Sequence, residues 1–273
     1  MRRIAYLGPE GTFSDILARQ RFGAADYLDC GTIEGVFDRI LSGEANLGLV
    51  PVENSSGGTV YDTVDLLIRH AGDITIREEL ALDIRIALLG RRGEAVKTVF
   101  SHFIQLKHHA AWLKARFPGA RLVTVDSTAI AARRAGAKKN AAALASPGAA
   151  ARYGLEALEM PGGAGTVNVT NFFVIARHSA PTGRPDRTAL VAALRNECGS
   201  LHRFLGPFAR EKVSLTRIVS RPVPGQPQTY VFYVEIEGGQ DRPPVGRALA
   251  RATKIARSLD SLGTFPLGKR FSS

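Results

Sequence analysis

The sequence has few cysteines and no long apolar run, and these absences exclude several classes of protein. Only two cysteines, Cys30 and Cys198, occur among 273 residues, too few for a disulfide framework or a cysteine-rich metal motif. Such a low content is typical of proteins of the reducing cytosol. No apolar stretch is long enough to span a membrane, and residues 1–4 enter a strand-like run without the apolar core of a signal peptide. We therefore expect a cytoplasmic protein without a membrane partner.

Basic residues exceed acidic ones, but the basic residues are not gathered into one segment. The formal net charge is +11, so a nucleic-acid partner has to be considered. The densest basic runs are only pairs, at residues 91–92, 133–134 and 138–139, and no aromatic residues alternate with them as a base-stacking surface requires. We therefore expect no nucleic-acid partner, and a basic surface that steers a small anionic substrate.

The first 160 residues repeat the pattern of strand, polar turn and helix about six times, which predicts an α/β fold with mostly parallel sheets. Ligands of such folds lie beyond the carboxyl ends of the strands. The turns at residues 8–14, 53–59, 101–103 and 126–128 occupy that position. Residues 74–89 predict one long extended segment, which we expect to pass from one lobe to another.

Residues 46–64 contain the most informative of these turns. An apolar run over residues 47–52 predicts a buried strand, and a helical face begins near Val60. Between them, residues 53–58 (Glu-Asn-Ser-Ser-Gly-Gly) predict a turn whose free backbone N–H groups and helix dipole suit a carboxylate or phosphate. An ordinary strand-to-helix connection, with Asn and Ser serving as turn and cap formers, is equally consistent with these residues.

Two further segments complete the chain. Residues 166–176 predict a strand in which Asn168, Thr170 and Phe172 share one face, although an edge strand with a solvated face would show the same pattern. Residues 179–186, with two prolines and a glycine, predict a linker. The remaining elements follow the order β-α-β-β-α-β, which indicates a ferredoxin-like module of about 80 residues.

Several motifs resemble those of one enzyme family in the right order along nearly the whole chain. Residues 8–14 (Gly-Pro-Glu-Gly-Thr-Phe-Ser) and 51–60 (Pro-Val-Glu-Asn-Ser-Ser-Gly-Gly-Thr-Val) are similar to the opening and the most diagnostic motifs of prephenate dehydratases. Shorter matches follow at residues 127–129, 145–146, 153–155, 199–201 and 220–222. The chain resembles the monofunctional bacterial type, which carries a C-terminal ACT regulatory domain.

This resemblance implies a fold, an activity and partners. A two-lobed catalytic domain similar to type II periplasmic binding proteins would occupy residues 1–178, with lobe 1 at about 1–78 plus 160–178 and lobe 2 at about 79–159. The linker 179–186 and the ACT domain 187–273 would follow. The implied reaction, part of L-phenylalanine biosynthesis, converts prephenate to phenylpyruvate with loss of water and carbon dioxide. It needs neither a metal nor an organic cofactor. L-Phenylalanine is the implied allosteric effector, and a homodimer or homotetramer is the implied assembly.

The resemblance also assigns roles to individual residues. Thr170 would be catalytic, because it stands in the family's Thr-Arg-Phe motif, and we interpret its hydroxyl as a hydrogen-bond donor to the leaving oxygen. The role of Glu53 is open. The implied substrate-binding residues are Thr12, Asn54, Ser55, Ser56, Gly57, Ser101, Asn168 and Phe172. The implied effector-binding residues are Gly199, Ser200, Leu201, Ser220, Arg221 and Pro222.

Five positions, in four motifs, depart from the family pattern. Asn171 replaces the arginine of Thr-Arg-Phe, and Phe103 and Ile104 replace the proline and glutamine of Ser-His-Pro-Gln. In the ACT segments, Val219 replaces a glutamate and Ser200 an alanine. These departures keep two alternatives open. The chain could be a diverged paralogue that binds a related aromatic acid as a non-catalytic sensor. It could instead act on arogenate, or decarboxylate prephenate without dehydrating it.

Overall fold

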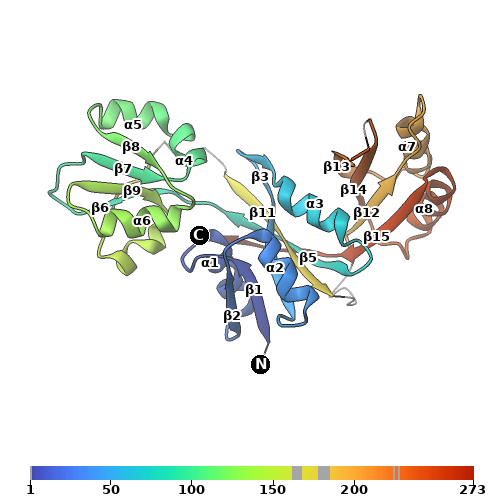
Figure 1. Ribbon diagram of the computed structural model, residues 1–273, viewed down its shortest axis with the longest axis horizontal. Helices are drawn as coiled ribbons and strands as arrows, with labels where there is room; N and C mark the ends of the chain where they lie inside the picture. The colour runs from blue at the N-terminus through green and yellow to red at the C-terminus, as the bar shows by residue number, and fades with distance from the viewer. Residues whose placement is uncertain (1, 162–167, 178–184, 224, 227) are drawn as a thin grey trace.

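The computed structural model describes the chain except residues 1, 162–167, 178–184, 224 and 227. Three sheets follow one another along the long axis of the molecule (Figure 1). The central sheet belongs to lobe 1, a second sheet forms lobe 2, and the third belongs to a C-terminal module. None of the helices in the described ranges is long and apolar enough to cross a membrane.

Lobe 1 is a central sheet with helices packed against it. Its strands lie in the order β16-β5-β11-β3-β1-β2, and β4 pairs with β3. The strands are β1 (Arg3–Leu7), β2 (Asp26–Cys30), β3 (Leu47–Asn54), β4 (Gly58–Thr59), β5 (Ile74–Asp83), β11 (Val169–Arg177) and β16 (Leu267–Ser272). The helices are α1 (Phe13–Phe22), α2 (Ile33–Leu41) and α3 (Tyr61–Arg69).

Lobe 2 is a smaller five-stranded sheet in the order β10-β6-β9-β7-β8. The strands are β6 (Ala87–Gly90), β7 (Thr98–Ser101), β8 (Arg121–Thr124), β9 (Ala141–Ala145) and β10 (Glu156–Glu159). The helices are α4 (Phe103–His108), α5 (Ala110–Arg116) and α6 (Thr128–Gly136), with 3₁₀ turns at Pro147–Ala149 and Ala151–Tyr153.

The local sequence explains these elements. In α2 the residues Ile33, Val36, Phe37 and Ile40 are buried, the spacing of a helix with one apolar face. All five residues of β9 are buried, as expected for a strand covered on both faces. Thr12, Thr32 and Ser127 each accept a backbone N–H bond at the start of a helix, as N-cap residues do.

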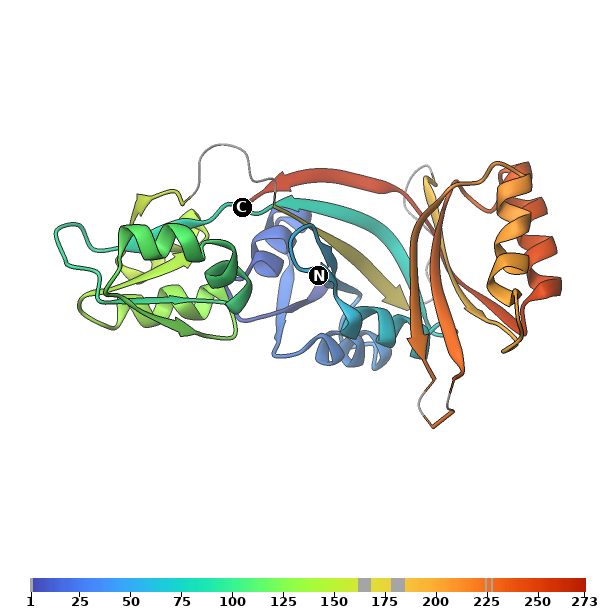
Figure 2. The ribbon, with the colours of Figure 1, turned by 90° about the horizontal axis from the view of Figure 1, so that it is seen from above.

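The C-terminal module has the β-α-β-β-α-β order that the sequence predicts. Its elements are β12 (Arg187–Ala193), α7 (Ser200–Arg210), β13 (Leu215–Pro222), β14 (Tyr230–Glu237), α8 (Pro243–Ile255) and β15 (Ser258–Phe265). Figure 2 shows both helices on the side of this sheet that faces away from lobe 1. The other side shares one hydrophobic core with lobe 1, in which Phe265 packs edge-on against Phe173 of β11. The module is therefore packed directly against lobe 1.

Three expectations from the sequence differ from the structure. The sheets of both lobes are mixed, because the chain crosses between lobes and returns, so that β11, β6 and β10 run antiparallel to their neighbours. Lobe 1 continues to the end of β5 at Asp83, beyond the expected boundary at 78. Residues 267–272 form β16, which pairs with β5 of lobe 1 although we expected them in the ACT domain (Figure 2). Most of the predicted linker 179–186 lies outside the described residues.

Candidate active site

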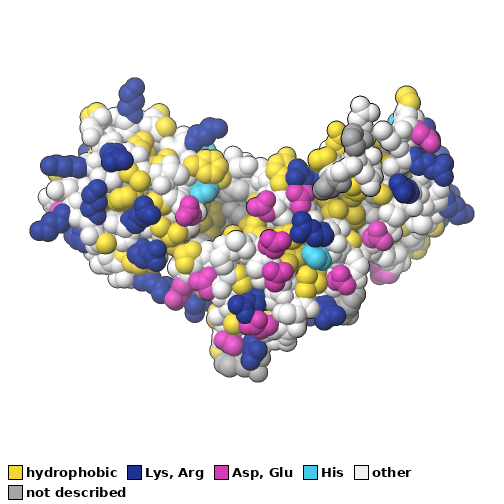
Figure 3. Space-filling model, in the orientation of Figure 1, with side chains coloured by type: hydrophobic (Ala, Val, Ile, Leu, Met, Phe, Trp, Pro, Cys, Tyr) yellow, Lys and Arg dark blue, Asp and Glu magenta, His cyan; other side chains and the backbone are white. Residues whose placement is uncertain are grey.

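A cavity of about 610 Å³ lies between the two lobes. Figure 3 shows lobe 2 and lobe 1 as separate masses with a recess between them. Lobe 1 contributes the start of α1, the end of β3 and the start of β11, whereas lobe 2 contributes α4 and the start of α6. Among the predicted site residues, those that line this cavity are Thr12, Asn54, Thr170 and Phe172.

Two helices begin at this cavity, one from each lobe. Phe13 and Ser14, the first residues of α1, line the cavity together with Thr128, the first residue of α6. The positive ends of two helix dipoles therefore face the same space, which favours a bound anion. Thr12 caps α1 by accepting from the Asp15 N–H at 3.3 Å, and it donates its hydroxyl proton to the Leu7 carbonyl at 3.0 Å, so it has no proton left to donate to a bound anion.

Asn54 orients the predicted catalytic threonine. Its Nδ2 donates to Thr170 Oγ1 and to Asn168 Oδ1, both at 2.8 Å. Because Thr170 accepts this bond, its own hydroxyl proton is left to be donated into the cavity. The register of the sheet explains the contact, since Thr170 on β11 lies directly opposite Asn54 on β3. The arrangement can hold a hydrogen-bond donor at a fixed place beside a bound anion.

The turn at residues 53–58 differs from the sequence interpretation. It is the tip of a hairpin between β3 and β4, and α3 begins only at Tyr61. Its N–H groups are already used: Ser56 and Gly57 donate to Asn54 Oδ1 at 2.9 and 2.8 Å, and Ser55 donates to the Val169 carbonyl. The expectation that these N–H groups bind an anion was therefore wrong. The turn instead holds the side chain of Asn54 in place.

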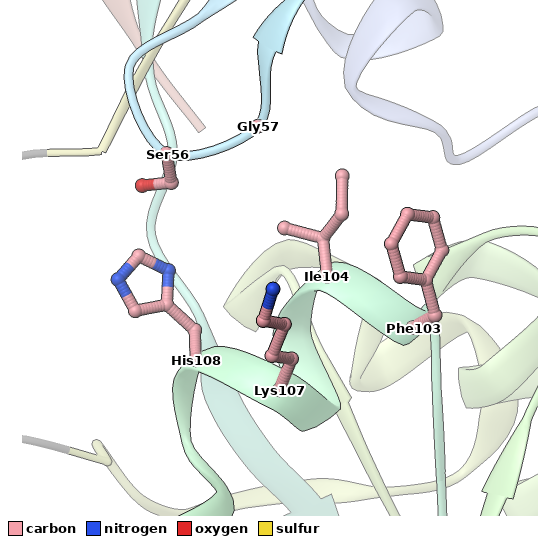
Figure 4. A pocket seen from close by; sticks show the side chains of 6 residues that line it. All are labelled: Ser56, Gly57, Phe103, Ile104, Lys107 and His108. Atoms are coloured by element: carbon pink, nitrogen blue, oxygen red, sulfur yellow. The ribbon is translucent and has the colours of Figure 1, made fainter.

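Ser56 and Gly57 line a second pocket, of about 370 Å³, where the hairpin tip faces α4 of lobe 2. Figure 4 shows Ile104, Lys107 and His108 of α4 directed toward the hairpin. The fit is close at Gly57, where an added Cβ would lie 3.1 Å from Ile104 Cδ1. The two lobes therefore meet at this point, beside the main cavity, which Ile104 also lines.

Ser101, a predicted substrate-binding residue, and Glu53, whose role was open, both face away from the cavity. Ser101 is fully buried, and its hydroxyl donates to the Leu144 carbonyl at 2.7 Å, so the structure places it beneath the cavity wall. Glu53, whose role was open, extends toward the C-terminal module and pairs with Arg217 of β13 at 2.7 Å. Its negative charge is therefore neutralised by the module and does not face a bound anion.

The predicted effector residues lie at one end of the module's sheet. Ala193 of β12, which precedes the segment 199–201, and Arg221 of β13 are both opposite Val231 of β14, so both predicted segments lie toward the same end of the sheet. Ser200 lines a pocket of about 260 Å³ together with Lys254, while Gly199 caps α7 and Leu201 packs toward the module core. Ser220 and Pro222 are exposed. Arg221 forms a bidentate pair with Asp65 of α3.

Several cavity residues from lobe 2 were not predicted as site residues. His102, Gln105, Asp126 and Arg133 all line the cavity. The turns at 101–103 and 126–128, which follow strands of the predicted sheet, were the available signal for His102 and Asp126. Burial lowers the pKa of His102, while the nearby Asp126 acts in the opposite direction. The imidazole is therefore biased toward its neutral form.

A family model, sequence relatives and solved structures identify one family for this chain. A family model described as prephenate dehydratase matches residues 4–180. A bifunctional chorismate mutase/prephenate dehydratase of Stutzerimonas stutzeri is 37% identical over 270 residues, which are 97% of this chain and 73% of that protein. The crystal structure of a prephenate dehydratase from Arthrobacter aurescens in complex with L-Phe has a TM-score of 0.86 and 30% identity, covering 97% of this chain and 89% of that one. A structure described as a quorum-quenching acylase has a TM-score of 0.85 and 28% identity, covering 98% of both chains.

Proposed function

This chain belongs to the prephenate dehydratase family, and we propose that its interlobe cavity converts prephenate to phenylpyruvate. The observation that carries the proposal is the hydroxyl of Thr170, which Asn54 holds at a cavity where two helices begin. A hydrogen-bond donor beside an anion-binding space is the combination that this reaction needs.

The chemistry requires little from the protein. The prephenate dianion and one proton give the phenylpyruvate monoanion, carbon dioxide and water. The C–C bond to the ring carboxylate breaks, its electron pair enters the ring, and the ring hydroxyl leaves. Because a threonine hydroxyl is too weak an acid to transfer its proton at neutral pH, Thr170 stabilises the leaving oxygen by donating a hydrogen bond to it. The proton that completes the water comes from solvent.

The missing motif arginine is compatible with this mechanism. Thr170 and Phe172 line the cavity, so Asn171 between them faces the opposite side of β11. Its cross-strand partner is Glu53, the residue that Arg217 neutralises. We infer that Arg217 of the module supplies the positive charge that an arginine at position 171 would place beside Glu53.

The C-terminal module is proposed to be an ACT domain that binds L-phenylalanine between two paired copies of the chain. The β-α-β-β-α-β order and the placement of both effector segments at one end of the sheet support this proposal. The solved relative in complex with L-Phe supports it also. Pairing of the modules would make the protein a homodimer or a homotetramer.

Acylase activity is the second candidate, favoured by the solved structure that is described as an acylase. An acylase of the hydroxyl type needs a serine or threonine activated by a base within hydrogen-bond reach. Among the described residues, no hydrogen bond joins His102 to a hydroxyl of the cavity wall. The geometry therefore supports the dehydratase better.

The test is phenylpyruvate formation from prephenate, followed by absorbance in alkali with the spontaneous rate subtracted. We expect a rate well above background in the purified protein, lost in Thr170→Ala and largely retained in Thr170→Ser, which keeps the donor. Arogenate and an N-acyl amide are assayed in parallel. Folded protein without prephenate turnover would refute the proposal, and turnover of one of the other compounds would identify the alternative.

A further inference from the structure

Lobe 2 carries most of the net positive charge of the chain. Residues 84–160 contain 13 Lys and Arg against 4 Asp and Glu, a net +9 of the total +11. Figure 3 shows many of these basic side chains over lobe 2, whereas acidic side chains are more frequent over lobe 1. A dianionic substrate that enters the cavity is therefore attracted toward the lobe 2 wall, opposite Thr170.

Gln105 of α4 is a buried polar side chain without a partner on that wall. It lines the cavity, is only 6% exposed, and its Oε1 accepts no hydrogen bond. Within the part of the chain that the structure describes, no hydrogen bond of its amide nitrogen is present either. The oxygen is an acceptor that a carboxylate cannot pair with, whereas the amide N–H groups of this cavity-lining residue remain free to donate to a bound anion.

Arg133 of α6 is the second unpaired group on the same wall. It is the one Lys or Arg among the described residues that line the cavity. Several other arginines of lobe 2 are held in ion pairs, for example Arg116 with Glu159, but no ion pair or hydrogen bond of Arg133 is found within the described ranges. Neither of the described acidic residues on the cavity wall, Asp29 and Asp126, forms an ion pair with Arg133.

We propose that Gln105 and Arg133 bind a carboxylate group of the substrate on the lobe 2 wall, while Thr170 meets the ring hydroxyl from lobe 1. The proposal rests on the proposed function only in naming prephenate as the molecule that carries this carboxylate. An arginine gives a charge-assisted bond to a carboxylate, and the glutamine amide donates a second bond in a space that water leaves on binding.

The first experiment measures prephenate binding by calorimetry at neutral pH in a Thr170→Ala background, which removes turnover. We expect Arg133→Gln to weaken binding at least about tenfold, as loss of a charge-assisted contact implies. Arg134→Gln is the matched control, because Arg134 is exposed like Arg133 but does not line the cavity, so the affinity of this variant should be unchanged. Equal affinities in the two variants, or equal losses, would overturn the proposal.

The second experiment separates a ligand-binding role of Gln105 from a structural one. Gln105→Met has a similar volume without the unpaired amide, so its melting temperature should rise by about 2–4 °C while prephenate affinity falls at least about threefold. If Gln105 served only in packing, the Gln105→Met variant would lose stability. If Gln105 had no role in binding, the variant would keep its affinity for prephenate. Either result would overturn the assignment of Gln105. Prephenate binding without turnover would refute only the dehydratase, whereas no binding in any variant would overturn the present inference.

Discussion

Arg217→Met removes the central cation of a buried cluster between the C-terminal module and lobe 1. The Arg217 guanidinium contacts Glu53 at 2.7 Å and Glu79 at 3.4 Å, and it also pairs with Glu235. Arg187 is the second cation, 2.8 Å from Glu79 and 3.6 Å from Glu235. Without Arg217, Glu79 and Glu235 would share one arginine and Glu53 would lose its ion-pair partner.

The magnitude follows from burial. The side chain of Arg217 is 8% exposed, that of Glu79 5% and that of Glu235 0%. Removing one partner of a buried ion pair costs about 3–5 kcal/mol, because the remaining charges stay buried without compensation. For a chain of this size that corresponds to a fall in melting temperature of roughly 6–15 °C. Arg221→Met is the matched control: its pair with Asp65 is 29% and 38% exposed, so its loss should cost at most about 1 kcal/mol.

The loss of stability in Arg217→Met should also depend on pH. Burial raises the pKa of Glu79, as does the nearby Glu235, while Arg217 and Arg187 lower it. A carboxyl group whose folded pKa is raised stabilises the fold below its unfolded pKa, and that contribution is lost as pH rises through the folded value. Removing Arg217 raises the folded pKa further, so the difference between Arg217→Met and the unmodified chain should be larger at pH 8 than at pH 5.

Thermal unfolding of both variants and the unmodified chain at pH 5 and pH 8 checks this reasoning. Phenylpyruvate formation is measured in parallel, because Glu53 directly precedes Asn54 and its release should disturb the hold on Thr170. A loss below about 1 kcal/mol, equal to that of Arg221→Met, would show that water or a shifted side chain compensates the carboxylates. A deficit that shrinks as pH rises would refute the assigned direction of the Glu79 pKa.

Two further predictions concern the cavity. Asn54→Asp keeps the oxygen that accepts from Ser56 and Gly57, but its carboxylate can only accept from Thr170, so kcat should fall about 10–100-fold, as in Asn54→Ala. The melting temperature should fall less in Asn54→Asp than in Asn54→Ala. Equal kcat in Asn54→Asp and the unmodified chain would contradict the donor role of Thr170. The pKa of His102 is lowered in the folded chain, so the unfolded chain binds the imidazole proton first and stability falls as pH drops below 6.5. Between pH 7.5 and 5.5 the melting temperature of His102→Gln should therefore fall less than that of the unmodified chain. Equal falls in the two proteins would contradict the lowered pKa of His102.

Much of the fold could be predicted because its determinants are local. Alternating or continuous apolar runs and N-cap residues such as Thr12, Thr32 and Ser127 place most strands and helices. Strand partners depend on distant parts of the chain, so the sequence did not reveal that β16 crosses back to β5. The same limitation concealed the antiparallel strands, which follow from the two crossings between the lobes.

The site was predictable where a motif and a strand face coincide. Alternation places Thr170 and Phe172 on one face, and both line the cavity. The side chain of Asn54, however, satisfies the turn that was expected to bind an anion, a choice that no local pattern encodes. Glu53 was uninterpretable because its partner Arg217 lies 164 residues further along the chain. Gln105 emerges as a candidate only when its burial and its missing partner are known.

The pairing of β16 with β5 turns the C-terminal module into an insertion within the catalytic sheet. The chain leaves that sheet after β11, builds the module, and returns to form the edge strand, where Arg270 pairs with Asp83 and the Ser273 hydroxyl accepts from the Arg85 N–H between the lobes. Cutting the gene after residue 178 would therefore strip a strand from the catalytic unit and expose the edge of β5. A self-contained catalytic unit requires excision of the module and a short loop that rejoins Arg177 to Leu267.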